Sequence, residues 1–258
     1  MAPPDDSPGA RANLATLLSK VRPSQRVLVA ESYGGRDEPV DTLLSSLVDV
    51  GVTPFGVGAL RVRDTPSEAT FQAFEEAGTD LAQALTQKAD VAALKAAMPP
   101  DLSKALARLS GGLYVVTAAH GASGARSAMI ASWVAQASFE PPGLTVAVAK
   151  DRAVESLMQV GDAFVLNCLG EARFGPAMKH FLQRFPPGAD RFEGIAWHPD
   201  PSCGVPVLED AIAHLACRVV SRLETPDHFV TYAAVEGGGV ADADARTAVH
   251  RRKVANYY

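Results

Sequence analysis

The stretch that decides the fold is SAMIASWVAQASFEPPG, residues 127–143. It contains two apolar runs of strand length, Ser127–Trp133 and Ala135–Phe139, and a third run, Leu144–Ala149, follows it directly. Runs this short favour strands, because helices usually need about ten residues or more. Several short strands in close succession predict antiparallel pairing in this part of the chain.

The same pattern continues outward on both sides. Runs of strand length occur at Leu113–Ala118, Ser127–Trp133, Ala135–Phe139, Leu144–Ala149, Ala163–Leu169, His214–Leu223 and Phe229–Val235. The sixth run alternates with period 2, which places apolar side chains inward and two arginines outward. The inward set is Leu215, Cys217, Val219 and Leu223, and the outward pair is Arg218 and Arg222. Residues 224–227 form a hairpin turn, and helices are expected at Ala153–Val160 and Phe174–Arg184. The sequence therefore predicts a mainly β fold, a closed antiparallel barrel.

The front of the chain has a different pattern. An apolar run, Arg26–Ala30, leads into a Gly-rich turn, and a helical pattern follows that should end at Gly51. A second strand around Phe55–Val62 precedes a helix for which Thr65 is the expected cap, with Glu68 closing a capping box. This order of elements is half of a doubly wound α/β sheet.

Composition excludes several classes of function. The chain has 258 residues and a net charge of -5, so it lacks the cationic surface that a nucleic-acid binder needs. No apolar run approaches the roughly 20 residues of a membrane span. The three cysteines, Cys168, Cys203 and Cys217, are too scattered for a disulfide framework, and we expect a reducing compartment.

Three groups of residues could form a site. In residues 127–143 small side chains would let a flat ligand approach the backbone, and Ser132, Gln136 and Ser138 could contact a heteroaromatic edge. Small residues also serve barrel curvature, and a tryptophan such as Trp133 is commonly a core residue. The segment Lys150–Ala153 joins a strand to a helix that Asp151 could cap, which suits a phosphate, although a solvated turn would look the same.

The third candidate is His228, beside Asp227 at the start of the last long strand. A side chain at the rim of a barrel can point toward a bound ligand, but a histidine in a turn is often only a hydrogen-bonded surface residue. No run with the spacing of a di-iron site or of a nucleophile elbow is present. The sequence thus predicts no metal site.

Several segments appear in the order seen in flavin reductase domains with the FMN-binding split barrel. They are Gly111–Thr117, Ser127–Pro142, Lys150–Ala153, Phe164–Asn167, Asp190–Phe192, Gly204–Leu208 and Asp227–His228. More narrowly, the chain resembles the C-terminal part of the flavodiiron proteins of oxygenic phototrophs. Val29–Arg36 is similar to the third FMN loop of their flavodoxin-like domain, and Glu75–Leu81 to its last helix.

The resemblance implies four parts. They are a disordered lead (1–21), the end of a flavodoxin-like domain (22–88), a linker (89–103) and a flavin reductase-like FMN-binding split β-barrel (104–258). The other FMN loops and all di-iron ligands would lie before Met1. The chain therefore looks like a C-terminal fragment or a short gene model.

The resemblance also implies site residues. The FMN ring would lie against Ser132, Trp133, Gln136, Ala137 and Ser138, and the cofactor-binding set also includes Ser127 and Met129. The phosphate would be held by Lys150, Arg152 and the amide of Ala153, where many relatives have Ser or Thr. His228 would contact the nicotinamide, with Pro226 replacing the usual glycine of the turn.

The implied function is hydride transfer from NAD(P)H to N5 of FMN, with electrons passing on to a di-iron centre outside this chain. The donor could be a nicotinamide nucleotide or ferredoxin, the assembly a homo- or heterodimer, and the location the chloroplast stroma or the cytoplasm. One alternative is a noncatalytic docking module with weak or no flavin. A relative of pyridoxamine-phosphate oxidase shares the barrel but lacks support from the turn at Asp227.

Overall fold

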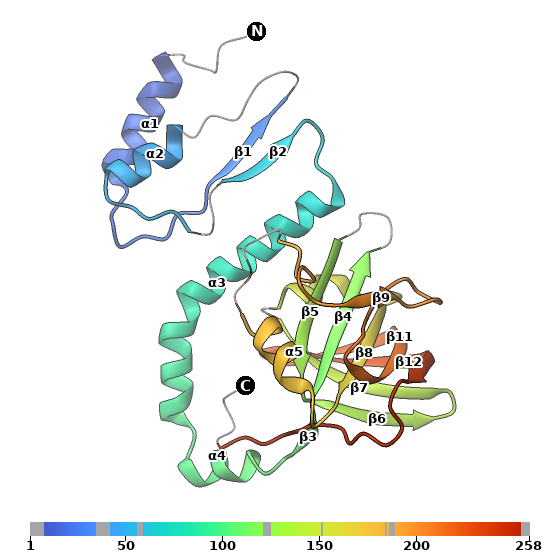
Figure 1. The fold of residues 1–258 in the computed structure, drawn as a ribbon. Helices are drawn as coiled ribbons and strands as arrows, with labels where there is room; N and C mark the ends of the chain where they lie inside the picture. The colour runs from blue at the N-terminus through green and yellow to red at the C-terminus, as the bar shows by residue number, and fades with distance from the viewer. Residues whose placement is uncertain are drawn as a thin grey trace. The chain divides into compact units, whose positions relative to one another are not determined.

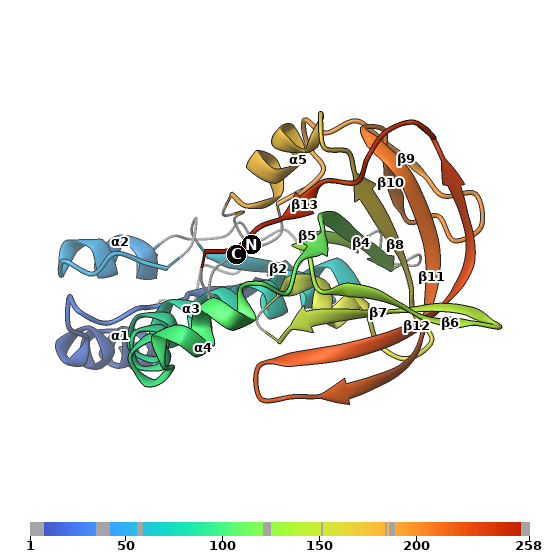
Figure 2. The same cartoon turned by 90° about the horizontal axis from the view of Figure 1, so that it is seen from below.

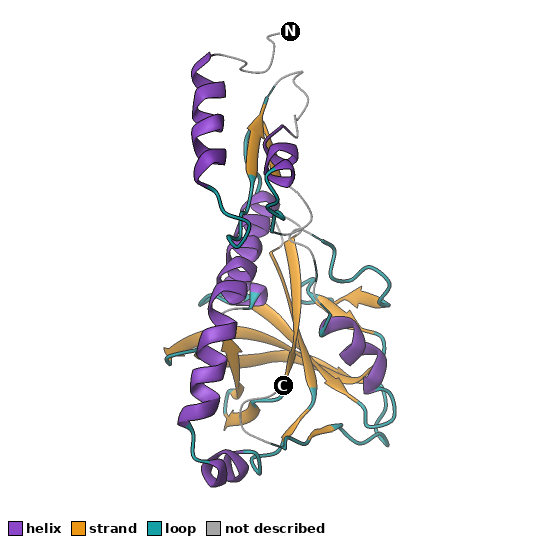
Figure 3. Ribbon diagram, turned by 90° about the vertical axis from the view of Figure 1, so that its left-hand side faces the viewer, coloured by secondary structure: helices purple, strands orange, loops and turns teal. Residues whose placement is uncertain are grey.

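A computed structural model describes residues 8–34, 42–55, 59–120, 125–150, 152–183, 185 and 189–253. The chain divides into two compact units, residues 1–81 with 186–188, and residues 82–185 with 189–258. Figure 3 distinguishes helices from strands and shows that the second unit consists mainly of strands.

The first unit is a small α/β unit. Its elements are α1 (Pro8–Lys20), β1 (Ala30–Tyr33), α2 (Thr42–Asp49), β2 (Leu60–Arg63) and the start of α3 (Glu68–Ala97). β1 and β2 pair in parallel, with Ala30 opposite Leu60, as expected for half of a parallel sheet. Leu47 of α2 is buried in its core. Gly51 has φ +79°, and such a left-handed residue ends a helix readily, as the sequence predicts.

Several boundaries in this unit differ from the prediction. Helix α1 occupies most of the predicted disordered lead, because residues 10–18 are rich in alanine and leucine, which favour helix. β1 begins at Ala30, where the predicted strand ends. Residues 35–41, which include the end of the Gly-rich turn and the start of the predicted helix, lie outside the described residues.

The cap of α3 is also different. Ser67, and not Thr65, caps the helix, since Ser67 Oγ accepts a hydrogen bond from the Thr70 amide at 3.2 Å. Thr70 Oγ1 accepts one in return from the Ser67 amide, also at 3.2 Å. The reciprocal pair of a capping box therefore forms two residues later, with threonine in the place expected for glutamate. α3 continues to Ala97 through much of the predicted linker.

The second unit contains α4 (Pro100–Leu106), η1 (Ala153–Leu157), α5 (Phe174–Phe181) and eleven strands of the described chain. Seven strands form one antiparallel sheet in the order β5-β4-β8-β11-β12-β7-β6. They are β4 (Tyr114–His120), β5 (Ala125–Ala131), β6 (Val134–Phe139), β7 (Pro142–Ala149), β8 (Ala163–Leu169), β11 (Ala211–Glu224) and β12 (His228–Val240). The four short strands are β3 (Gly111–Gly112), β9 (Trp197–Pro199), β10 (Pro206–Leu208) and β13 (Val249–His250). The predicted mainly β fold is confirmed.

The sheet curves into a split barrel. Its edge strands β5 and β6 are consecutive in the chain and are joined by Ser132 and Trp133. Figures 1 and 2 show the sheet from two directions, with the long β11–β12 hairpin at one side. Ser132 and Trp133 thus connect the two edges of the sheet, and both are predicted site residues.

Two apolar clusters stabilise the barrel. One fills its interior, where Val116, Val146 and Phe164 are fully buried, and η1 contributes Val154 and Leu157 to it. The other lies under α5, whose Ala177 and Phe181 pack with residues of β4, β5 and β8. Packed side chains therefore cover both faces of β4, β5 and β8.

Two predictions about the barrel need correction. The alternation in β11 changes at a bulge between Val219 and Ser221, so Leu223 is 66% exposed and Arg222 turns inward to an ion pair with Glu155. An extra residue in one strand moves later side chains to the other face. The predicted helix Ala153–Val160 is a five-residue 3₁₀ helix, and its cap is Arg152; Asp151 lies outside the described residues.

Candidate functional site

A cavity of about 580 Å³ lies in the second unit, between the β6–β7–β12 surface and the segments around α4 and residue 252. Its size suits a small-molecule ligand. It is lined by Met98, Leu106, Leu109, Ser110, Gly111, Ser132, Trp133, Val134, Ala135, Thr145, Ala147, Val230 and Arg252. The lining is largely apolar, with a few polar groups.

The floor of this cavity is a strip of small side chains on neighbouring strands. Ala135 of β6 stands opposite Thr145 of β7, and Ala147 of β7 stands opposite Val230 of β12. Positions two apart on a strand share a face, so Thr145 and Ala147 point the same way. A flat aromatic ligand could therefore lie close to the backbone of three strands.

Trp133 stands at one side of this floor. Its indole is 40% exposed and lies against the imidazole of His228, with ring centroids 4.9 Å apart. The guanidinium carbon of Arg252 is 5.4 Å from the centre of the indole. Trp133 is therefore a wall of the cavity, and the alternative that it belongs to the core is wrong.

Ser132 contributes a buried polar atom to the same cavity. The residue is 4% exposed, and its Oγ has no hydrogen-bond partner in the described part of the chain. A buried hydroxyl without a partner costs free energy. A side chain at Gly111 would collide with the Ser132 carbonyl oxygen, so glycine is needed beside this link.

Another part of the cavity wall comes from the end of α4 and from the segment that follows β13. Arg252 Nη2 donates hydrogen bonds to the carbonyl oxygens of Leu106, at 3.3 Å, and Leu109, at 3.2 Å. Figure 1 shows α4 beside the last described residues of the chain, coloured dark red. These bonds tie the segment after β13 to the end of α4 and hold the guanidinium at the cavity.

Lys150 and Arg152 lie just past the end of β7, where the sequence predicts a phosphate site. The Lys150 amide donates to the Asp227 carbonyl oxygen at 3.0 Å, which ties this turn to the β11–β12 hairpin. Lys150 Nζ lies 2.6 Å from Glu224 Oε1, and this hydrogen bond lowers the pKa of the Glu224 carboxyl. Arg152 is exposed and immediately precedes Ala153, the first residue of η1.

Phe229 is an unpredicted member of this region. Lys150 Nζ lies 5.3 Å and the Arg222 guanidinium carbon 3.9 Å from the centre of its ring. Contacts of this kind between a cation and an aromatic face hold long side chains in place. The sequence points to Phe229 only through its position one residue after His228. The contact with Arg222 depends on the bulge in β11, which the alternation of residues in the sequence does not reveal.

His228 begins β12, as predicted, and pairs with Ala149 of β7. It is 8% exposed, and its Nδ1 lies 3.0 Å from Asp227 Oδ1. Thr225 closes the turn, accepting from the His228 amide at 3.0 Å and donating to its carbonyl oxygen at 2.7 Å. The imidazole is thus fixed between Asp227 and the face of Trp133.

The other predicted cofactor residues lie outside the cavity lining. Ser127 and Met129 are buried, with Met129 in the barrel interior. Gln136 and Ala137 are exposed on β6. Ser138 Oγ lies 2.7 Å from the Pro141 carbonyl oxygen and 2.9 Å from the Tyr232 hydroxyl. The structure thus brings Ser132, Trp133 and His228 together, with Lys150 and Arg152 past the end of the adjoining strand.

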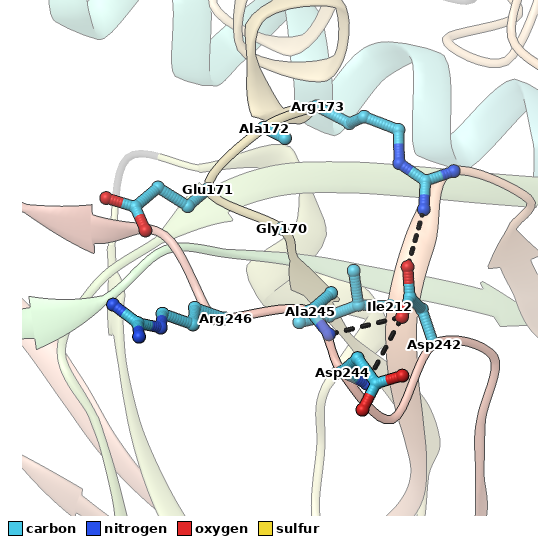
Figure 4. A pocket seen from close by; sticks show the side chains of 9 residues that line it. All are labelled: Gly170, Glu171, Ala172, Arg173, Ile212, Asp242, Asp244, Ala245 and Arg246. Atoms are coloured by element: carbon cyan, nitrogen blue, oxygen red, sulfur yellow. Dashed lines mark hydrogen bonds and ion pairs between the residues drawn. The ribbon is translucent and has the colours of Figure 1, made fainter.

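A second cavity of about 580 Å³ has a charged lining (Figure 4). Its lining residues are Gly170, Glu171, Ala172, Arg173, Ile212, Asp242, Asp244, Ala245 and Arg246. Arg173 Nη2 lies 3.0 Å from Asp242 Oδ2, while Asp242 Oδ1 accepts from the amides of Asp244 and Ala245. These polar groups already bond one another, so the cavity points to no particular ligand.

Two other properties of the described residues bear on chemistry. Within them, no cluster of three or more His, Cys, Asp or Glu side chains is arranged to hold a metal ion, and no helix is long and apolar enough to cross a membrane. The three cysteines are free, and burial raises the pKa of the Cys217 thiol to about 12. A thiol with so high a pKa is a poor nucleophile near neutral pH.

Comparison with known proteins places this geometry among flavin proteins. The family model described as "Flavin reductase like domain" matches residues 106–257. "Diflavin flavoprotein A 1" of Synechocystis sp. is 53% identical over 95% of this chain and 42% of its own length. A diflavin flavoprotein of Nostoc sp. is 50% identical over 100% of this chain and 44% of its own length. The chain therefore spans less than half the length of these relatives.

A solved structure is similar to the barrel. The NADH:FAD oxidoreductase of Streptomyces globisporus is 23% identical, with a TM-score of 0.52, over 57% of this chain and 85% of that one. At this identity the likeness concerns the fold alone.

Proposed function

This chain belongs to the flavin reductase-like family and is a flavin-binding oxidoreductase module related to the cyanobacterial diflavin flavoproteins, and we propose that it binds FMN and accepts hydride from NAD(P)H. The observation that carries the proposal is the largely apolar cavity beside Trp133, with its floor of small side chains on three neighbouring strands. The chemistry is FMN's own, because bound FMN supplies an N5 atom that accepts hydride from the nicotinamide.

The residues present fit the flavin ring. Ala135, Thr145 and Ala147 leave room for a flat ring over the strands, and Trp133 provides an aromatic wall. The shape of the cavity and its few polar groups therefore suit a ring of this kind.

The phosphate would lie beyond the end of β7. Ala147, on the floor, is three residues from Lys150, a distance of about 10 Å along an extended strand. We assign Lys150, Arg152 and the amide of Ala153 to the phosphate, with the ribityl chain along the strip between. Because η1 is a single short turn, the two side-chain cations are expected to provide most of the attraction.

His228 is assigned to the nicotinamide. Its imidazole lies on Trp133 and next to Asp227. His228 pairs with Ala149, the last residue of β7, which Lys150 follows in the chain. Its proposed role is to orient the nucleotide so that hydride is delivered in the correct geometry, without a proton transfer. Ser127, Met129, Gln136, Ala137 and Ser138 remain proposed cofactor neighbours from the resemblance.

The wider role is proposed from the relatives. We infer that electrons pass on to a di-iron centre outside this chain, that ferredoxin is an alternative donor, and that the barrel pairs with a copy or a paralogue. A net charge of -5 gives little repulsion against association, and sedimentation with flavin bound would test the dimer. Three free thiols fit a reducing compartment.

A titration with FMN tests the proposal. The chain has two tryptophans, Trp133 at the cavity and Trp197 against Phe192 and Arg126. FMN should quench the fluorescence of the Trp197→Phe variant strongly, saturating at one flavin per chain. The matched Trp133→Phe variant should show much weaker quenching. A colourless protein that takes up no FMN would instead support the docking module.

A further inference from the structure

Arg222 of β11 reaches across to η1, the short helix that begins where the phosphate is assigned. Its Nη2 forms an ion pair with Glu155 of η1, and its Nη1 donates to Gln159 Oε1 at 2.5 Å. Gln159 lies two residues after the end of η1. A guanidinium holds its donors in a fixed, planar fork, so it restrains the direction as well as the distance of both partners. One side chain of the barrel wall therefore holds η1 at two points.

The pair between Arg222 and Glu155 is largely shielded from water. Their side chains are only 11% and 21% exposed, and the guanidinium carbon lies 3.9 Å from the centre of the Phe229 ring. Loss of one partner from a shielded pair leaves the other charge poorly solvated, whereas an exposed pair contributes little. The same strand carries an exposed pair for comparison, in which Arg218 Nε lies 2.7 Å from Glu236 Oε1.

The backbone connects Glu155 directly to the segment that is assigned to the phosphate. The Glu155 amide donates to the Arg152 carbonyl oxygen at 2.9 Å, and the Arg152 amide donates to the carbonyl oxygen of Ala149 at 3.0 Å. Val154 and Leu157 of η1 are buried in the barrel interior. A shift of η1 would therefore move Arg152 relative to the end of β7.

The second cation of the phosphate segment is near the same group of residues. Lys150 Nζ lies 5.3 Å from the centre of the Phe229 ring, which the Arg222 guanidinium also contacts. Arg222 has its charge paired with Glu155 and its other donor bound to Gln159. Its contacts are thus directed at the protein, and they hold the surroundings of both cations.

We propose that Glu155 and Arg222 are positioning residues for the flavin phosphate, because their ion pair holds η1 where Lys150 and Arg152 can bind one phosphate together. This inference rests on the proposed function. The proposal has an unusual sign. By charge alone, a carboxylate three residues from Arg152 repels a phosphate, so its removal would strengthen binding. By position, its removal weakens binding, because the cations must then be ordered when the phosphate arrives.

The test measures dissociation constants for FMN and for riboflavin, which has no phosphate, in wild type, Glu155→Ala, Arg222→Ala and Arg218→Ala. Glu155→Ala and Arg222→Ala should each weaken FMN binding about tenfold and leave riboflavin binding unchanged. Arg218→Ala removes a cation from the same strand and should behave as wild type. Stronger binding of FMN by Glu155→Ala would show that this carboxylate acts by charge alone and would overturn the inference.

The double variant tests whether the two residues act as a pair. Adding Glu155→Ala to Arg222→Ala should cause no further loss of FMN affinity, because the ion pair is already broken. Losses that add would show that the two side chains act separately, which would overturn the inference. Equal weakening of FMN and riboflavin would assign the pair to the support of the barrel in general, with the same consequence.

A gentler variant covers the case in which the alanine variants do not fold. Glu155→Gln keeps the size of the side chain and one acceptor oxygen for Arg222, so the local structure is preserved. It should still weaken FMN binding, whereas Glu224→Gln, which frees Lys150, should strengthen it. A change in the same direction in both variants would overturn the inference.

The wild type separates failure of this inference from failure of the proposed function. If wild type binds neither FMN nor riboflavin, the proposed function is wrong. If it binds both flavins equally well, the phosphate is not recognised and the inference fails, while flavin binding stands.

Discussion

Lys150 Nζ lies 2.6 Å from Glu224 Oε1, so the lysine assigned to the flavin phosphate is already held by a carboxylate across the β11–β12 hairpin. A phosphate that binds Lys150 must compete with this carboxylate. The ion pair is exposed on the Glu224 side, so it contributes little to folding.

Replacing the competing carboxylate should strengthen flavin binding. We expect Glu224→Gln to lower the dissociation constant for FMN severalfold, because Lys150 is released while the side chain keeps its size. Binding of riboflavin should not change. The measurement is a fluorescence titration with both flavins, and weaker FMN binding in this variant would show that Glu224 positions Lys150 for the phosphate.

Removing both cations should abolish tight binding of FMN. Lys150→Ala with Arg152→Ala deletes two charge-assisted contacts, each worth about 1.5 to 3 kcal/mol, so affinity should fall at least ~100-fold. Riboflavin affinity should stay close to that of wild type, which makes it the internal control. If the double variant retains FMN through dilution, the phosphate site lies elsewhere.

The stability of the second unit should fall at acid pH through His250. Its pKa is lowered from 6.5 by burial and by Arg252, so below about pH 6.5 the unfolded chain takes up a proton that the folded chain resists. Stability that is present above this pH is therefore lost as the pH falls. His250→Gln should reduce the difference between urea midpoints at pH 7.5 and pH 5.5. Identical differences in both proteins would contradict this.

The front segment alone should bind no flavin. Residues 22–88 resemble only the last part of a flavodoxin-like domain, and β1 and β2 form a sheet of just two strands in the described chain. Unpaired strand edges and a missing phosphate loop leave neither a stable core nor a complete site. Stoichiometric FMN bound to a chain ending at Lys88 would overturn this prediction.

The strands of the barrel could be predicted because each is marked by its own residues. β8 matches its predicted bounds, Ala163–Leu169, because its run is apolar and short. The inward or outward direction of Leu223 and Arg222 could not be predicted, since the bulge at Val219 and Ser221 depends on pairing with β12. The sequence therefore predicts the strand, but after a bulge it no longer predicts which side chains point inward.

The site was only partly predictable for a related reason. Ser132, Trp133 and His228 lie in or beside recognisable segments, but Gly111 and Arg252 join them only through the β3–β13 pairing and the end of α4. No local pattern indicates that residue 252 returns to a helix that ends at residue 106. A cavity wall that is built from segments far apart in the sequence can be identified only from the structure.

The prediction that separates binding from hydride delivery concerns His228. His228→Ala should leave FMN bound, because the imidazole lies on Trp133 outside the cavity lining, 4.9 Å from the indole. Loss of one contact of about 1.4 kcal/mol should raise the Km for the nucleotide or slow flavin reduction about 10-fold in stopped-flow measurements. His228→Phe keeps an aromatic ring on Trp133 without the ring nitrogens, so it should be as slow as His228→Ala. Recovery in the phenylalanine variant would show that stacking alone matters, and release of FMN with unchanged nucleotide kinetics would assign His228 to the flavin.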